Sequence, residues 1–391
     1  MRGFLCLTPC TRFCSKVKMR IIHLASLFAE IGPIAKNGNE RFVWMLAEYQ
    51  AAQGHDVSII ATKNSQVPKN VKWLDLGIVP GQLPSLPVDP ANANQNNLES
   101  YLNSMPQQRE FFVPVIKFLQ NAKNDFVLHN SSQDNTALFD LNAIGIPIVH
   151  TLHQTCNLPW AIAAFKKQKG QTPPHVQYVA VSHASAKLYQ DTVGLTPKVI
   201  HNGCDENIPF NAVANDRAIW ASRISPEKGL HTAIKAVAIR AHQHLDVVGP
   251  IYDTEYYQNL KPHLQHPLVS YHGVLPNYEL VRLMGAAKAF IFPIQFEESF
   301  GLVVVESLFA GTPVIAYPRG GVVEIIQDGV NGFFVNSEEE IAAALTRIKN
   351  LDRRKCRDSV LEKFNLKTMV DNYHKIYAEL KKSVRAEAAS C

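Results

Sequence analysis

Residues 19–61 read MRIIHLASLFAEIGPIAKNGNERFVWMLAEYQAAQGHDVSIIA and contain one complete strand–helix–strand unit. Residues 20–24 form a short apolar run that is typical of a buried strand. Apolar residues then recur at helical spacing over 40–53, and Gly54 is placed to end that helix. Residues 56–61 are apolar and rich in β-branched side chains, which predicts a second strand. A unit of this kind indicates a parallel sheet with a right-handed crossover.

The same pattern continues along the chain and then restarts. Further strands are expected, in a first series and then a second, at 126–129, 146–150, 178–181, 218–221, 245–248, 269–271, 289–292 and 313–316. Two series of similar size predict an α/β fold with two facing Rossmann-like, doubly wound domains. Because ligands of open α/β sheets bind at the carboxyl ends of the strands, we expect the site in the cleft between the domains.

The chain divides into four expected parts. Residues 1–18 are expected to be a disordered basic leader, 19–205 the N-terminal domain and 206–365 the C-terminal domain, while 366–391 form a helix that crosses back to the N-terminal domain, and then a tail. Cys6, Cys10 and Cys14 lie in the leader. They leave a signal peptide or a zinc site open as alternatives, but Pro9 interrupts the short apolar part and the cysteine spacing is unusual for zinc.

Composition limits the class of protein. The 391 residues are 46% hydrophobic and 19% charged, with a net charge of +5, which excludes a disordered or collagen-like chain and does not call for nucleic acid. No apolar stretch is long enough for a transmembrane helix. The number of cysteines is odd, at seven, and four of them are widely scattered, which favours a reducing compartment, so we expect a cytoplasmic protein. The basic run 353–357 is interpreted as a solvated helix face, with peripheral contact to anionic lipid as the alternative.

Two carboxylates stand eight positions apart around the start of an apolar helix. Glu298 precedes Gly301 and Leu302, and Glu306 falls inside the apolar stretch. A carboxylate there needs a hydrogen-bonding partner, and the open helix N-terminus offers N–H groups to a phosphate. The structural alternative is that Glu298 caps the helix and Glu306 pairs with an arginine in the core.

Two cations follow another predicted strand, directly before a helix. Arg223 and Lys228 lie in the segment RISPEKG, which covers residues 223–229. Point charges beside a helix N-terminus suit a diphosphate. The alternative is a solvated basic turn.

Over about residues 19–382 the chain resembles the retaining GT-B glycosyltransferases, closest to family 4. The motifs that carry this resemblance occur in the expected order: Asn37-Gly38-Asn39-Glu40, Gly54-His55-Asp56-Val57, Pro147 to His153, Val181-Ser182, Ile200 to Asp205, Arg223 with Lys228, Glu298 with Glu306, Gly320 to Glu324, and Asp328 to Gly332. Each motif is weak alone, and their shared order makes the resemblance strong.

The resemblance assigns most of the donor site to the C-terminal domain, as the nucleotide-sugar domain. It implies that Arg223 and Lys228 hold the diphosphate and stabilise its charge as it leaves. Glu306 is expected to accept both ribose hydroxyls, and Glu298 to contact a hydroxyl of the donor sugar. Backbone amides are expected to help at Phe300, Gly301 and Leu302.

The N-terminal domain is expected to hold the acceptor. The resemblance implies that His153 faces the donor sugar and that Gly38 lets the first loop approach the phosphates. Asn37 departs from the family pattern, where a glycine is usual, and its side chain could crowd the phosphates or reflect an unusual acceptor. The loops 81–108 and 154–174 are expected to help select the acceptor.

The implied activity is that of a retaining hexosyltransferase. A nucleotide-sugar, with UDP favoured over GDP, would donate its sugar to an unknown hydroxyl acceptor by a front-face mechanism, with no metal and no further cofactor. The alternatives are a GT-B nucleotide-sugar epimerase or phosphorylase, or an inactive sugar-nucleotide-binding protein. A dinucleotide-dependent dehydrogenase is disfavoured because no strand is followed by G-x-G-x-x-G.

Overall fold

The computed structural model describes residues 18–32, 38–80, 109–123, 125–132, 138–154, 162, 165–166 and 172–390, with side chains to residue 384. Several predictions concern other residues and lie outside this part of the chain. These predictions concern the leader up to residue 17, Asn37, the loop 81–108 and most of the loop 154–174.

The first sheet, within the described residues, has seven parallel strands in the order β3-β2-β1-β4-β5-β6-β7. Its strands are β1 (Arg20–Leu24), β2 (Asp56–Ala61), β3 (Lys72–Asp75), β4 (Phe126–Asn130), β5 (Ile148–Leu152), β6 (Val176–Ala180) and β7 (Lys198–Val199). Its helices are α1 (Gly38–Ala52), α3 (Val113–Asn121), α4 (Leu138–Asn142) and α6 (His183–Val193). The strand order reverses between β1 and β4, where a doubly wound sheet opens toward a ligand.

The second sheet, in the same described part, has six parallel strands in the order β10-β9-β8-β11-β12-β13. Its strands are β8 (Ala218–Ala221), β9 (Leu245–Val248), β10 (Val269–Tyr271), β11 (Ala289–Phe292), β12 (Val314–Ala316) and β13 (Gly332–Phe334). The helices are α7 (Leu230–Ile234), which continues as a π-helix over Lys235–Arg240, and α8 (Thr254–Leu264), α9 (Asn277–Ala286), α10 (Leu302–Phe309), α11 (Glu338–Arg347) and α12 (Arg353–Leu361). Short 3₁₀ turns cover η1 (Pro226–Lys228), η3 (Gly320–Glu324) and η4 (Ile348–Asn350).

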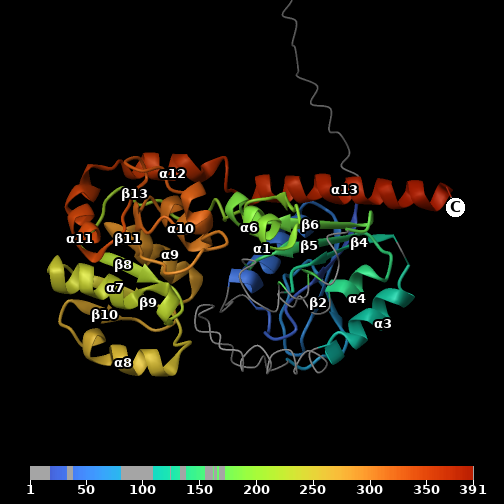
Figure 1. The fold of residues 1–391 in the computed structure, drawn as a ribbon, viewed down its shortest axis with the longest axis horizontal. Helices are drawn as coiled ribbons and strands as arrows, with labels where there is room; N and C mark the ends of the chain where they lie inside the picture. Colours follow the sequence, from blue (N-terminus) through green and yellow to red (C-terminus); the bar gives the residue numbers. More distant parts are fainter. Residues whose placement is uncertain are drawn as a thin grey trace, which may run out of the picture.

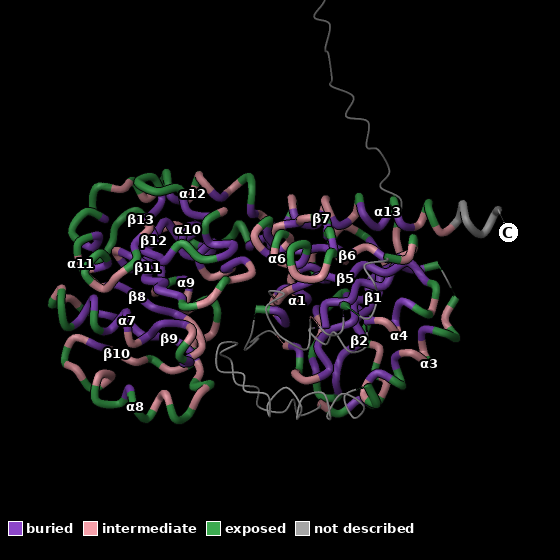
Figure 2. Tube along the Cα trace, viewed as in Figure 1, coloured by how far each residue is buried: buried purple, intermediate pink, exposed green. Residues whose placement is uncertain are grey.

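The two sheets lie in two separate lobes, each covered by its own helices (Figure 1). The predicted α/β fold with two Rossmann-like domains is confirmed. Figure 2 shows that the strands form the buried interior of each lobe. All residues of β4 and β5 are buried, because helices cover both faces of a parallel sheet, and this explains why these strands read as continuous apolar runs.

The last helix, α13 (Leu366–Ser390), follows the second lobe in sequence but packs on α1 and the first sheet (Figure 1). Two buried tyrosines anchor it. The hydroxyl of Tyr377 lies 2.5 Å from His129 Nδ1, and the hydroxyl of Tyr373 lies 3.0 Å from Thr151 Oγ1. None of the described helices, α13 included, has the length and apolarity needed to cross a membrane.

The basic run at the start of α12 is solvated at Arg354 and Lys355 but not at Arg353 and Arg357. Arg353 donates to the Gly285 carbonyl at 2.6 Å, and Arg357 donates to the Ile208 carbonyl at 2.8 Å. Both guanidinium groups therefore donate to backbone carbonyls rather than only to solvent. The earlier interpretation was wrong for these two residues, because an arginine can bury its stem and still use its five donors.

Candidate active site

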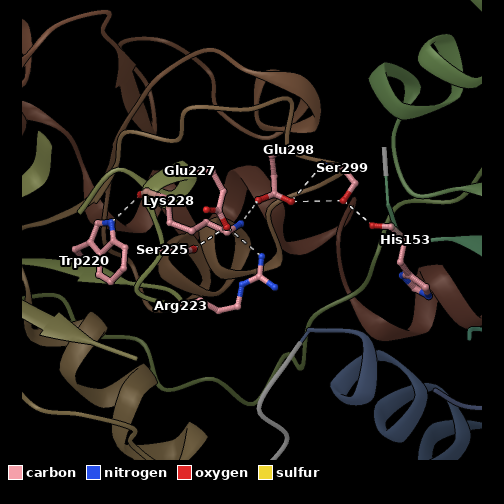
Figure 3. A network of polar contacts seen from close by, with 8 residues as sticks. All are labelled: His153, Trp220, Arg223, Ser225, Glu227, Lys228, Glu298 and Ser299. Atoms are coloured by element: carbon pink, nitrogen blue, oxygen red, sulfur yellow. Dashed lines mark hydrogen bonds and ion pairs between the residues drawn. The ribbon is translucent and has the colours of Figure 1, made fainter. Parts of the chain in front are cut away.

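Lys228 is held at the end of the turn that follows β8. Only 9% of the residue is exposed, and its Nζ lies 2.9 Å from Glu298 Oε2 (Figure 3). The indole of Trp220 donates to the Lys228 carbonyl at 3.2 Å, which fixes the backbone of the turn. The ammonium also lies 4.5 Å from the centre of the Phe296 ring. A buried ammonium needs such a carboxylate partner, so the fold fixes this cation in one place.

Arg223 stands beside Lys228 but is more open. Its Nη2 lies 3.3 Å from Glu227 Oε1, and its guanidinium lies 4.5 Å from the centre of the Tyr252 ring. Ser225 Oγ donates to the same Glu227 oxygen at 2.6 Å. One third of the Arg223 side chain remains exposed, so the guanidinium is oriented and still able to reach a ligand.

The start of α10 supplies backbone donors next to Glu298. Gly301 precedes the helix with a φ of +99°, a left-handed conformation that favours glycine, and no side chain caps the helix there. The first N–H groups of a helix have no partner within it and attract anions. Gly320 packs directly against the backbone of Glu298, and only a glycine fits there, since a Cβ would lie 2.2 Å from the Glu298 carbonyl oxygen. The predicted Lys228, Glu298 and Gly301 are thus brought together.

Glu306 lies deeper in α10 and is 1% exposed. Its Oε1 pairs with the guanidinium of Arg41, which comes from α1 in the other domain. Its Oε2 is buried and has no hydrogen-bond partner among the described residues. Burial lowers the pKa of Arg41, the charge of Glu306 raises it, and the net shift is upward. Sequence reasoning left an arginine partner open for Glu306 but did not identify Arg41.

His153 follows β5 at the carboxyl end of the first sheet. Its backbone carbonyl, rather than its imidazole, faces the C-terminal domain and accepts from Ser299 Oγ at 2.7 Å (Figure 3). The imidazole lies 4.5 Å from the Phe42 ring, and its Nε2 has no hydrogen-bond partner in the described part of the chain. Burial lowers the pKa of His153 to about 3, so the ring is neutral at pH 7.

Gly38 is the first residue of α1, and nothing lies within 4 Å of where its Cβ would be. It stands three residues before Arg41, whose side chain reaches Glu306, so this end of α1 faces the cleft. The structure therefore places predicted residues on both sides: Gly38 and His153 on the first domain, and the carboxylates and cations on the second.

Glu324, in η3, makes a further polar contact between the domains, and sequence reasoning did not assign it a role. Its carboxylate accepts from the backbone N–H groups of His183 and Ala184, at 3.1 and 2.8 Å, and lies 2.7 Å from His201 Nε2. Burial raises its pKa, these hydrogen bonds lower it, and the net shift is downward. Within the described residues, His183, His201 and Glu324 also form the one group with metal-binding atoms close enough, within 4.8 Å, to share an ion. The hydrogen bonds already satisfy the carboxylate.

Two facing parallel-sheet domains, with charged groups gathered where they meet, define the GT-B class of fold. Two family models match the chain on either side of residues 208–210. The model described as "Glycosyltransferase Family 4" matches residues 36–207, and the model described as "Glycosyl transferases group 1" matches residues 211–361. The chain belongs to the group 1, family 4-like glycosyltransferases.

Similar proteins agree with this family. A D-inositol 3-phosphate glycosyltransferase from Thermomonospora curvata is 27% identical over 304 residues, which span 63% of this chain and 69% of that protein. One from Streptomyces griseus is 27% identical over 51% of this chain and 53% of its own length. The matches thus span about half to two thirds of these relatives.

Solved structures show the same fold. A sucrose-phosphate synthase from Thermosynechococcus elongatus is 18% identical with a TM-score of 0.74, covering 94% of this chain and all of that one. HepE from Anabaena, solved with UDP and glucose, is 18% identical with a TM-score of 0.67, covering 92% of this chain and 99% of its own.

Proposed function

We propose that the protein is a retaining hexosyltransferase that moves a sugar from a nucleotide-diphosphate sugar to a hydroxyl group. The observation that carries this proposal is the 2.9 Å pair of Lys228 and Glu298 beside the open N-terminus of α10. A cation and free N–H groups suit the diphosphate of such a donor, and a carboxylate beside them suits a hydroxyl of its sugar.

Each part of the donor has its own partner in this proposal. Lys228 and Arg223 hold the diphosphate, with the first amides of α10. Glu298 accepts from a sugar hydroxyl, and Glu306 accepts from the ribose. These cations and helix amides neutralise the departing diphosphate, so the transfer is proposed to need no metal.

The transfer is proposed to occur on one face of the sugar. The bond from the anomeric carbon to the diphosphate oxygen breaks with its electron pair going to the diphosphate, and an acceptor oxygen bonds to the same face. The acceptor proton passes to the leaving diphosphate. His153 is neutral because of its lowered pKa, so it places no positive charge beside the sugar.

UDP is the favoured nucleotide. HepE was solved with UDP and glucose, and a pneumococcal O-GlcNAc transferase of related fold was solved with UDP and GlcNAc. These neighbours support a UDP-sugar as donor, with a GDP-sugar as the alternative. The acceptor is proposed only as a hydroxyl of a small molecule, glycan or glycolipid.

A ligand screen followed by product analysis tests the proposal. Thermal shifts are measured with UDP, GDP and ADP, because a ligand at 100 times its Kd stabilises the folded state by about 2.7 kcal/mol. UDP is expected to give the largest shift. UDP-glucose and UDP-GlcNAc are then incubated with the protein, and mass spectrometry detects released or transferred sugar.

The same assay separates the alternatives. An epimerase changes the donor sugar without an acceptor, and a phosphorylase releases sugar phosphate only with inorganic phosphate. An inactive binding protein shifts with UDP but consumes no donor. Absence of a shift with all three nucleotides contradicts the proposal.

A further inference from the structure

Three cations of the cleft, among the described residues, each hold a cleft carboxylate. The pairs are Lys228 with Glu298 at 2.9 Å, Arg223 with Glu227 at 3.3 Å, and Arg41 with Glu306. The first two pairs lie within the C-terminal domain. The pair of Arg41 and Glu306 joins the two domains, and sequence reasoning gave Arg41 no role.

The Arg41 pair conflicts with the role proposed for Glu306. A carboxylate that accepts one ribose hydroxyl on each oxygen needs room for a second donor at Oε1. Oε2 is buried without a partner among the described residues, while Oε1 is already paired with Arg41. A ribose hydroxyl that binds Oε1 therefore competes with the guanidinium for that oxygen.

A displaced Arg41 needs another anion, because about four fifths of its side chain is buried. The nearest strong candidate is the diphosphate proposed to lie at the start of α10. Glu306 is four residues beyond Leu302, which is about 6 Å along the helix at 1.5 Å per residue. The planar guanidinium also matches two phosphate oxygens at once.

We propose that Arg41 exchanges Glu306 for the diphosphate of the donor and becomes its third cation, supplied by the N-terminal domain. This inference rests on the proposed function. In this exchange the guanidinium of Arg41 keeps an anionic partner, because it moves from the carboxylate to the diphosphate. The carboxylate of Glu306 accepts hydrogen bonds from the ribose hydroxyls in its place. A nucleoside without phosphates competes with Arg41 for Glu306 and gives the guanidinium no new partner.

Nucleotide affinities test this exchange. Binding of uridine and UDP is measured by calorimetry for the wild type and Arg41→Gln, with guanosine and GDP in parallel. In Arg41→Gln, UDP affinity is expected to fall about 10- to 100-fold, the usual cost of losing a charged hydrogen bond. Uridine affinity should stay the same or rise, because its ribose no longer competes with the guanidinium. Arg41→Lys should give an intermediate UDP affinity, since a lysine keeps the positive charge but cannot bind two phosphate oxygens in the way that a planar guanidinium does.

The controls separate this idea from simpler ones. Arg240→Gln removes an exposed arginine that pairs with Glu339 at 2.6 Å on the outer surface, and it should change neither affinity. If Arg41→Gln is unstable, the double variant Arg41→Gln/Glu306→Gln removes both buried charges, and its UDP-to-uridine affinity ratio must still fall. An unchanged ratio in these variants overturns the exchange while leaving the proposed function standing. A wild type that binds neither UDP nor GDP overturns both.

Discussion

The two halves of the cleft use different chemistry. On the C-terminal half, charges come in close pairs such as Lys228 with Glu298. On the N-terminal half, the polar groups near the strand ends are histidines, and burial lowers their pKa: to about 4 for His23, to about 3 for His150 and His153, and well below the ordinary value for His129. At pH 7 these histidines are neutral, so Arg41 of α1 is the cleft cation that the N-terminal half contributes, while the C-terminal half carries the paired charges that suit an anionic donor.

The partners of these histidines explain why the N-terminal half carries so little charge. His23 Nε2 lies 2.7 Å from Gln50 Oε1, and His150 Nε2 lies 2.8 Å from Asn142 Oδ1. These partners are neutral amides, which satisfy the rings without stabilising a positive charge. The half-buried carboxylate of Glu298 instead faces the ammonium of Lys228 at 2.9 Å.

Removing a charge from the C-terminal half should have the largest effect. In Lys228→Ala the leaving diphosphate loses a fixed cation, and turnover should fall about 10²- to 10³-fold. Arg223→Ala should cause a similar loss. Initial rates of donor consumption measure this, with circular dichroism to verify that each variant is folded.

Lys235→Ala is the matched control, because Lys235 pairs with Glu338 only at 3.8 Å and half of its side chain is exposed. Its turnover should equal that of the wild type. If Lys228→Ala and Arg223→Ala also kept wild-type turnover, the C-terminal half would not be the donor site.

The fold was readable from sequence where strands are buried on both faces. The strands β1, β2 and β8 are apolar runs, and their predicted positions match the structure. Three edge strands were missed. β3 (Lys72–Asp75) is mostly exposed, and β7 and β13 have two and three residues, so none shows a clear pattern. Their pairing depends on the neighbouring strand, which single-sequence periodicity does not contain.

The site was readable only where charge follows a local motif. Arg223, Lys228 and Glu298 stand next to strand ends and a helix start, and the structure brings them together. Arg41 could not be found this way, because its partner Glu306 is 265 residues away in the other domain. A buried glutamate in an apolar helix signals that a cation is needed, but only the packing of the domains identifies which one.

Acid should destabilise the N-terminal half first. A histidine with a lowered folded-state pKa binds fewer protons when folded than unfolded between pH 6.5 and its folded pKa. The free energy of unfolding therefore decreases as the pH is lowered through that window, by about 1.4 kcal/mol per pH unit for each such histidine. Its contribution is fully present above pH 6.5; for His23, with a folded pKa of about 4, the loss extends from pH 6.5 to 4.

Urea unfolding at intervals from pH 7.5 to 5 measures this slope. His23→Gln should make the slope shallower, whereas the exposed His244→Gln should leave it unchanged. A free energy of unfolding that stays flat down to pH 5 would show that these histidines are not held neutral, and the contrast between the two halves would disappear.

The smallest change in stability is expected for a substitution in α13, the helix that packs on the N-terminal domain. Tyr373→Phe removes one buried hydrogen bond, the 3.0 Å contact with Thr151 Oγ1, and keeps the ring packed against Phe42 and His129. The free energy of unfolding should drop by about 1 kcal/mol in urea. UDP affinity should not change, because α13 packs on the first domain and the proposed donor contacts come mainly from the second. A loss of UDP affinity in this variant would mean that the packing of α13 on the first domain shapes the donor site, contrary to this expectation.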